Sequence, residues 1–351
     1  MSLLRRTRHV AAAAALGGGL GAAGLGAAGL VGYGVLKAEA RIARRTVGKP
    51  FEEAPDDSDT YGTGHGPALD LVVLGDSLAA GLGADSRFET IGGVLAVGVA
   101  ALTGRPVRLT NVAQVGAESS WLAGQVDRAL EAVPSAHVAL VTVGGNDVTH
   151  LIDHSESVRD LAEAVRRLRA SGAEVVVGTC PDLGTIEPVP QPLRSVVRIL
   201  SRDLAAEQTV AVVEAGGRTV SLGDLLAPDF LSSPEVMFST DRFHPSAAGY
   251  ARAAAALLPS VCAALGLWPD ETDRDPDRLR GEGVSSLDDA ADRAARSPGT
   301  EVSPATDPRR RGRVARLLRR RRPDGPPLED DEADEPGSPR TGAGISGFIG
   351  L

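Results

Sequence analysis

Short aliphatic segments alternate with helical stretches through the middle of the chain, and this alternation constrains the fold more than any other feature. Short aliphatic runs bounded by turn residues are typical of strands covered on both faces. They lie at Leu69–Leu74, Val107–Val112, His137–Val143 and Glu174–Thr179. Helices are predicted at Phe88–Leu102, Ser119–Ala132, Ser157–Ala170, Leu193–Ala215 and Pro245–Leu265. The order strand, helix, strand predicts a parallel sheet with helices on both faces over residues 68–268.

Polar clusters follow the first three strands at their carboxyl ends, where open parallel sheets bind ligands. A fourth cluster precedes the last helix. The clusters are Gly75-Asp76-Ser77, Asn111 to Gly116, Gly144-Gly145-Asn146-Asp147 and Asp241 to Pro245. The chain holds two asparagines, Asn111 and Asn146, and both lie in these clusters. Turns with left-handed backbone also favour asparagine, so this observation alone assigns no role.

These clusters can be assembled into a site for acyl transfer. A serine hydroxyl is a weak nucleophile that needs a neighbouring base, and the base needs a third group to orient it. We expect Ser77 to be the nucleophile, His244 the base and Asp241 the group that holds the imidazole. The oxyanion would be stabilised by the amide N–H groups of Ser77 and Gly116 and by the Asn146 side chain.

Other interpretations compete with this one. Ser77 could simply cap a helix, and Asp241 could cap the helix that begins near Pro245. His150, Asp153 and His154 have a spacing that could bind a metal, but no third ligand follows them. We therefore expect no metal and no cofactor, and we expect Asp76 and Asp147 to bond loop amides rather than transfer protons.

The four clusters together resemble the SGNH/GDSL hydrolase family. The resemblance rests on Gly75-Asp76-Ser77-Leu78, Gly116, Gly144-x-Asn146-Asp147 and Asp241-x-x-His244-Pro245, which occur in the family's order across about Ala68–Leu267. It implies a flavodoxin-like three-layer α/β/α fold with Ser77, Gly116, Asn146 and His244 as the site residues. It also implies activity as an esterase, lipase, thioesterase or acyl-sugar deacylase without a metal.

The substrate and the acceptor are less well defined. We expect a small-molecule, lipid or glycan ester, with hydrolysis through an acyl-enzyme. Transfer of the acyl group to a sugar or alcohol is an alternative, and so is a non-catalytic, membrane-anchored binding module. We expect loops at Ala117–Trp121, Thr149–His154 and Pro181–Pro192 to line the acyl pocket.

The first 36 residues predict a membrane anchor. A basic start is followed by Val10–Leu36, 27 residues without charge. A helix of that length reaches about 40 Å, more than the roughly 30 Å hydrocarbon core of a bilayer. A cleaved signal peptide and secretion is the alternative, since Lys37–Ala40 resembles a cleavage site. Basic residues flank both sides, so the side of the membrane stays open.

The segments on either side of the hydrolase domain are polar. We expect residues 37–67 to be a linker and 269–351 a disordered charged tail. Within the tail, Arg309–Arg322 holds nine arginines and could contact anionic lipid. It lacks aromatic residues, so nucleic acid is not an expected partner. The two cysteines, Cys180 and Cys262, are too few for a disulfide framework and predict free thiols.

Overall fold

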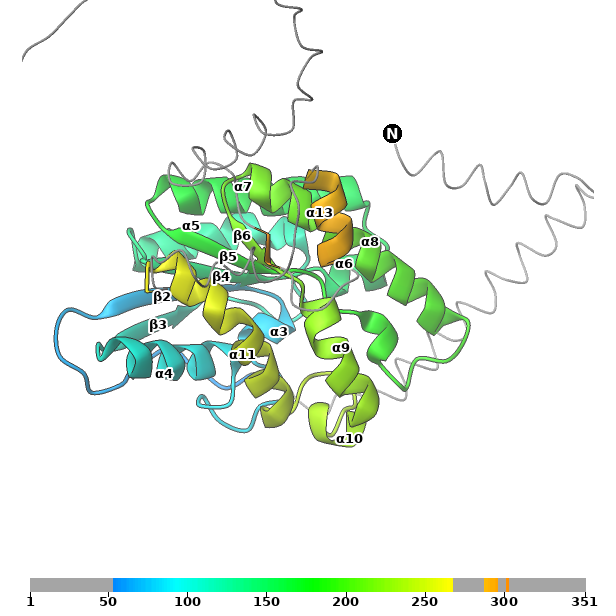
Figure 1. The fold of residues 1–351 in the computed structure, drawn as a ribbon, viewed down its shortest axis with the longest axis horizontal. Coiled ribbons are helices and arrows are strands. Elements are labelled where there is room, and N and C mark those ends of the chain that lie inside the picture. Colours follow the sequence, from blue (N-terminus) through cyan, green and yellow to red (C-terminus); the bar gives the residue numbers. More distant parts are fainter. Residues whose placement is uncertain (1–52, 268–286, 296–300, 303–351) are drawn as a thin grey trace, which may run out of the picture. The chain divides into compact units, whose positions relative to one another are not determined.

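A seven-stranded sheet forms the centre of the computed structural model, which describes residues 53–267, 287–295 and 301–302 (Figure 1). All of these belong to one compact unit, Met1–Thr306. The strand order is β1-β3-β2-β4-β5-β6-β7. The strands are β1 Thr60–Tyr61, β2 Leu69–Gly75, β3 Val107–Asn111, β4 Val138–Thr142, β5 Glu174–Gly178, β6 Arg218–Val220 and β7 Glu301–Val302.

The inner five strands are parallel, and the two edge strands, β1 and β7, run antiparallel to their neighbours. The sheet is therefore mixed, which corrects the prediction of a purely parallel one. Its predicted core strands are confirmed, with ends one residue longer or shorter than expected.

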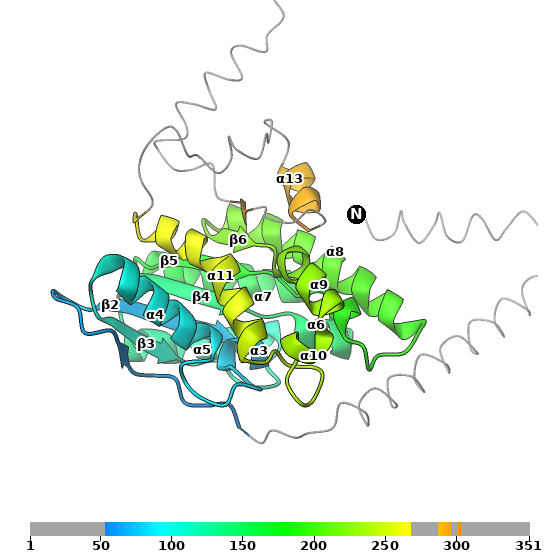
Figure 2. The same cartoon turned by 60° about the horizontal axis from the view of Figure 1, so that its bottom comes forward.

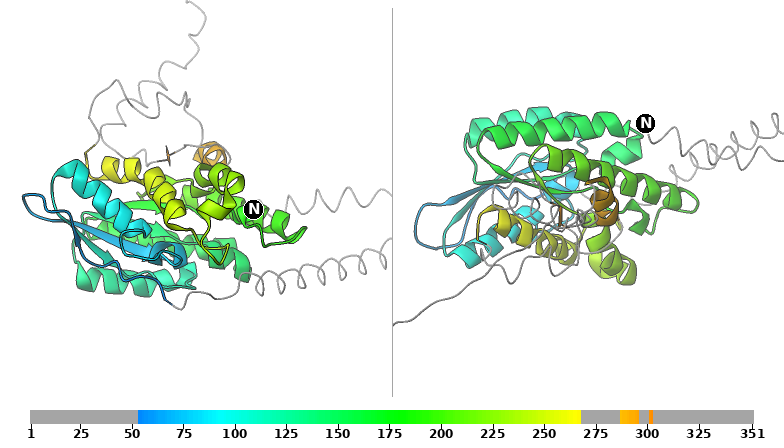
Figure 3. Two further views of the ribbon diagram at one scale, coloured as in Figure 1. Left: turned by 90° about the horizontal axis from the view of Figure 1, so that it is seen from below. Right: turned by 45° about the horizontal axis from the view of Figure 1, so that its top comes forward.

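Helices cover both faces of the sheet, as the alternation predicted. Helices α4 and α11 pack on one face, and α5 and α7 on the other (Figure 2). In the right panel of Figure 3 the green α7 lies above the sheet and the yellow α11 lies beneath it. The helices are α3 Ser77–Ala80, α4 Ile91–Thr103, α5 Leu122–Ala132, α6 Gly145–His150, α7 His154–Ala170, α8 Leu193–Glu214, α9 Leu222–Ser232, α10 Pro234–Met237, α11 Ala247–Ala264 and α13 Leu287–Ala294.

Strand β2 is buried along its whole length because both of its faces are covered. Leu71 and Val73 pack in the cluster that includes α4 and α11, whereas Val72 and Leu74 pack with α5 and α7. Alternation of side chains across a pleated strand places every residue of this run in one of two cores. The continuous aliphatic run is thus the sequence signature of a central strand.

The polar segment before β2 is not a simple linker. Asp57 and Tyr61 are buried, and β1 pairs with the start of β3. The Tyr61 hydroxyl donates to the Asp57 carbonyl (2.7 Å), and Asp57 accepts a hydrogen bond from Thr90 (2.6 Å). We call residues 57–61 the N-terminal strap. The domain therefore begins upstream of residue 57 and not at 68.

Part of the expected tail is also ordered. Helix α13 packs on α8, and β7 extends the sheet beside β6. Residues 287–295 and 301–302 therefore belong to the fold, which corrects the prediction of disorder for them. The predicted anchor at 1–36 and the arginine-rich segment 309–322 lie outside the described residues.

Among the described residues, one helix, α11, is long and apolar enough to cross a membrane. It also carries Tyr250, Leu257 and Val261, which are buried in the core. Helix α11 is accordingly a packed helix of the sheet's covering layer. Both cysteines are buried and free, as predicted.

Candidate active site

Ser77 lies directly beyond the carboxyl end of β2, at the first position of the short helix α3. Asp76 caps this helix, because its carboxylate accepts from the Leu78 amide at 3.0 Å. The cap is therefore the aspartate, and the serine hydroxyl is left for another partner. Gly75 has φ +138°, and a Cβ there would lie 1.9 Å from the Thr142 carbonyl oxygen, so only glycine fits before the turn.

The hydroxyl of Ser77 meets His244, which comes from the loop before α11. Ser77 Oγ lies 3.0 Å from His244 Nε2, and His244 Nδ1 lies 2.6 Å from Asp241 Oδ2. The other carboxylate oxygen of Asp241 accepts from the Phe243 and His244 amides at 2.8 and 2.9 Å. The sequence prediction that these three side chains meet agrees with this geometry.

Asp241 is held as a carboxylate. Burial would raise its pKa, but the hydrogen bonds from the His244 ring and from the Phe243 and His244 amides outweigh burial, so its pKa is lowered. A charged carboxylate on Nδ1 keeps that proton on the ring, which leaves Nε2 able to accept the serine proton. This is the arrangement a serine nucleophile requires.

Two of the predicted oxyanion donors, Asn146 and Gly116, come from neighbouring segments. Asn146 is in the first turn of α6, and its Nδ2 donates to the Ala117 carbonyl at 2.9 Å, which leaves its second N–H available. Gly116 adopts φ +84°, and a Cβ there would meet no atom within 4 Å. Asn146 lines the pocket beside Ser77, whereas Gly116 does not line it.

The two other acidic residues of the clusters bond loop amides. Asp147 is buried and accepts from the Ser119 amide (3.2 Å) and from the Ser157 hydroxyl (2.6 Å). This ties α6 to the loop that carries Gly116. Asp147 and Asp76 each accept a backbone amide, in keeping with the structural role expected of them.

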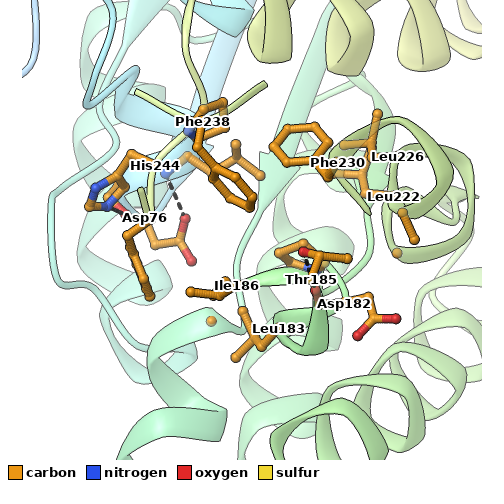
Figure 4. A pocket seen from close by; sticks show the side chains of 18 of the residues that line it. Asp76, Asp182, Leu183, Thr185, Ile186, Leu222, Leu226, Phe230, Phe238 and His244 are labelled. Carbon is orange, nitrogen blue, oxygen red and sulfur yellow. Dashed lines mark hydrogen bonds between the residues drawn. The ribbon is translucent and has the colours of Figure 1, made fainter. Parts of the chain in front are cut away.

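An apolar pocket of about 90 Å³ opens beside Ser77 and His244. Figure 4 shows it running from His244 toward Leu222 and Leu226, with Phe230 and Phe238 along one wall. The rings of these two phenylalanines stack edge to face with centroids 4.8 Å apart. Asp182 lines the end of the pocket away from His244 and forms ion pairs with Arg198 and Arg202.

Of the three loops that were expected to line the acyl pocket, one does so. Pro181, Leu183 and Ile186 line the pocket, but residues 117–121 and 149–154 do not. Another part of the wall comes from α9, which sequence reasoning missed. Its pattern of Leu222, Leu226 and Phe230, spaced four apart, was the available signal.

The histidines considered as metal ligands have other neighbours. His150 Nδ1 lies 2.7 Å from Glu118 Oε1, and His154 Nδ1 lies 3.8 Å from Glu207 Oε1. The Asp153 carboxylate caps α7. Within the described residues no group of three potential ligands gathers around a point.

Comparison with known proteins shows the family to which the chain belongs. Residues 73–252 match the model of the GDSL-like Lipase/Acylhydrolase family, and this range spans all four clusters. The chain belongs to this family. It is also 44% identical over 241 residues to the GDSL-like esterase Rv1075c of Mycobacterium tuberculosis, covering 66% of this chain and 77% of that protein.

Solved structures with a similar chain path include TesA, at 22% identity and a TM-score of 0.42, covering 56% of this chain and 99% of that one. Another is the psychrotrophic esterase EstA from Pseudoalteromonas sp., at 18% identity and a TM-score of 0.44, covering 56% and 98%. By its family, the chain is a carboxylic ester hydrolase of the esterase and lipase type.

Proposed function

We propose that the protein cleaves carboxylic esters through a Ser77–His244–Asp241 triad and a covalent acyl-enzyme. The observation that carries the proposal is the unbroken chain of contacts from Ser77 Oγ to His244 (3.0 Å) and from His244 to Asp241 (2.6 Å). Ser77 Oγ attacks the ester carbonyl as its proton moves to His244 Nε2. His244 then gives that proton to the leaving alcohol.

Water completes the cycle. His244 takes a proton from water, the hydroxide attacks the acyl carbonyl on Ser77, and the acid leaves as the proton returns to the serine. In both halves the tetrahedral oxyanion would be stabilised by the amides of Ser77 and Gly116 and by Asn146 Nδ2. Neither of those two amides donates to another group within the described part of the chain.

The test is replacement of Ser77 by alanine. S77A should lose turnover of a p-nitrophenyl ester and labelling by a fluorophosphonate probe, while D241N should retain the fold and lose about 10³–10⁴-fold in kcat. S195A is the matched control: it replaces an exposed serine outside the pocket and should keep wild-type rates. Undiminished turnover in S77A would contradict the proposal.

A second experiment distinguishes hydrolysis from acyl transfer: acceptor alcohols are added to the reaction and the products are analysed.

The pocket size favours a short acyl group. A cavity of about 150 Å³ holds one benzene molecule, so a pocket of about 90 Å³ has room for roughly four carbon atoms. We propose esters with acyl groups of up to about this length as substrates. The buried ring of Phe230 limits the wall on the α9 side.

Shortening Phe230 tests this size limit. F230A should improve kcat/KM for octanoyl relative to butanoyl p-nitrophenyl esters by about tenfold, because it lengthens the pocket. F88A removes an exposed phenylalanine elsewhere and should leave the ratio unchanged. An unchanged preference in F230A would show that this ring does not set the acyl length.

We further propose that the N-terminal segment tethers the domain to a membrane. The uncharged 27-residue run Val10–Leu36 supports this. The chain enters the domain at the edge of the sheet that carries Ser77. The Ser58 hydroxyl accepts from the Asn111 amide (3.0 Å) at the carboxyl end of β3, the edge that also carries Ser77. The full chain should stay in the membrane fraction after alkaline washing, and a chain beginning at residue 53 should not. Release of the full chain by washing, or secretion of a shortened form, would favour the signal-peptide alternative.

A further inference from the structure

A buried glutamine holds the backbone directly before the proposed nucleophile. Strand β3 ends at Asn111, and just after it the Val112 amide donates to the Val73 carbonyl at 2.9 Å and the Gln114 amide to the Gly75 carbonyl at 3.1 Å. The Gly75 N–H, in contrast, has no strand partner. Gln125 Oε1 accepts from the Gly75 N–H at 2.7 Å, and Gln125 Nε2 donates to the Gly75 carbonyl at 2.9 Å.

The position of Gln125 in its helix is unexpected for a polar side chain. It lies in the buried stripe of α5, together with Leu122, Val126 and Ala129, and its own exposure is 0%. An amide in such a stripe must have its hydrogen-bonding groups satisfied, because buried polar groups without partners are costly. Its carboxamide does so by bonding both backbone groups of Gly75.

Gly75 is two residues from Ser77, and the short turn between them is fixed on both sides. On the β4 side, the Asp76 amide donates to the Thr142 carbonyl at 3.0 Å. On the α5 side, Gln125 holds Gly75. The Gln114 amide also donates to the Gly75 carbonyl at 3.1 Å, but the Gly75 N–H is held by Gln125. The location of the Ser77 hydroxyl relative to His244 therefore depends on this side-chain amide in addition to the backbone contacts.

A second buried glutamine lies at the same edge of the sheet, between the ends of β4 and β5. Gln208 of α8 is also fully buried; it accepts from the Cys180 amide (2.8 Å) and donates to the Val143 carbonyl (3.0 Å). Val143 and Cys180 follow β4 and β5, where their ladder ends. Two buried glutamines thus bond backbone groups where strand pairing ends, at the edge of the sheet that carries the site.

We propose that Gln125 is a positioning residue for Ser77: its carboxamide fixes the Gly75 peptide so that the hydroxyl stays within reach of His244. The proposal rests on the function proposed above. It does not require contact with substrate, and Gln125 does not line the pocket. Its loss should therefore lower kcat and leave KM nearly unchanged.

Three variants test the proposal. Q125M keeps the size of the side chain but neither hydrogen bond, and should lower kcat by tenfold or more, since small misplacements of reacting groups are costly. Q125E accepts and donates like glutamine only while its carboxyl is protonated, and burial favours that state. The activity of Q125E relative to wild type should therefore fall as pH rises, whereas that of Q125M should stay low at every pH. V126A removes a buried neighbour on the same helix and should lower thermal stability with kcat preserved.

Each variant is compared with wild type at the same pH, because the ionisable side chains of Asp76 and His244 lie beside the same turn in every variant. Wild-type kcat in Q125M, or a constant ratio of Q125E to wild type from pH 5 to 8, would overturn the positioning role. A loss of kcat in V126A as large as that in Q125M, at equal loss of stability, would also overturn it. Wild type and S77A are measured in parallel to test the proposed hydrolase function. An inactive wild type, or an S77A variant as active as wild type, refutes that function. An active wild type with an inactive S77A and an unaffected Q125M refutes only this inference.

Discussion

Asp76, next to the proposed nucleophile, caps helix α3 and also makes the stability of the protein depend on pH. Burial raises the pKa of its carboxyl to about 6, and the nearby Asp147 carboxylate adds to this; the bond from the Leu78 amide and the charge of His244 act in the opposite direction. The folded protein therefore keeps a proton on Asp76 at pH values where the unfolded chain has lost it.

This difference predicts a pH dependence of stability. Between about pH 4 and 6 the folded state binds the extra proton, so the contribution of Asp76 to the free energy of unfolding falls as pH rises through this window. A pKa shift from 3.8 to about 6 amounts to about 3 kcal/mol. D76N should remove this fall, so that its stability relative to wild type increases from pH 4 to pH 7 in urea unfolding. A constant difference across that range would show that Asp76 ionises normally.

The residues that meet at Ser77 could be predicted from the sequence because each one stands in a recognisable cluster at a strand end. Asp241 and His244 are three residues apart, so a single loop places both. Gln125 could not be found in this way. Its proposed role depends on the Gly75 N–H, which has no partner in β3. The sequence does not show at which residue the hydrogen bonding between β2 and β3 ends.

At the level of elements, the loop that carries His244 depends on a close contact with the loop after α3. Gly83 has φ +101°, and a Cβ there would lie 2.9 Å from the Pro245 carbonyl oxygen and 3.1 Å from His244 Cβ. Two chain segments that are distant in sequence are thus in contact beside the imidazole. The glycine-rich stretch after Ser77 allows this approach.

Substitution of Gly83 should affect catalysis as well as folding. G83A forces the His244 loop outward and should lower kcat by about tenfold or more. Gly104 provides the matched control, because it has φ +63° but no atom within 4 Å of an added Cβ. G104A should cost about 1 kcal/mol of stability and keep wild-type kcat. Equal rates in G83A and wild type would show that the loop adjusts without moving His244.

The strands and long helices could be predicted because each has a continuous apolar pattern, whereas β6 and α9 could not. Strand β6 has three residues, too few for a pattern. Helix α9 contains Pro228, which removes a backbone donor and normally indicates the end of a helix. The short edge strand β1 was missed because its two residues are also too few for a pattern.

At the scale of the whole molecule, the segment after α11 completes the fold. Ala291 and Ala294 of α13 are buried, and Arg202 donates to the Ala295 carbonyl at 3.3 Å. The Arg218–Glu301 ion pair (3.0 Å) joins β6 to β7. None of these residues lines the pocket, so they contribute to stability rather than to the site.

Truncation separates these roles. A chain ending at Leu267 should lose about 2 kcal/mol, which for a domain of this size lowers Tm by roughly 4–8 °C. Its kcat at 25 °C should match that of the full chain. A chain ending at Thr306 retains α13 and β7 and should melt like the full chain. If both truncations melt alike, the docked segment contributes no stability.

The N-terminal strap has a practical consequence for anyone who produces the catalytic domain alone. A recombinant version that starts at Ala68, where the aliphatic pattern begins, would lose the partner of Thr90 and the strand that pairs with β3. Its open β3 edge would invite pairing with other copies during purification. The first codon should therefore lie upstream of Asp56, where the folded domain begins and not where its hydrophobic pattern does.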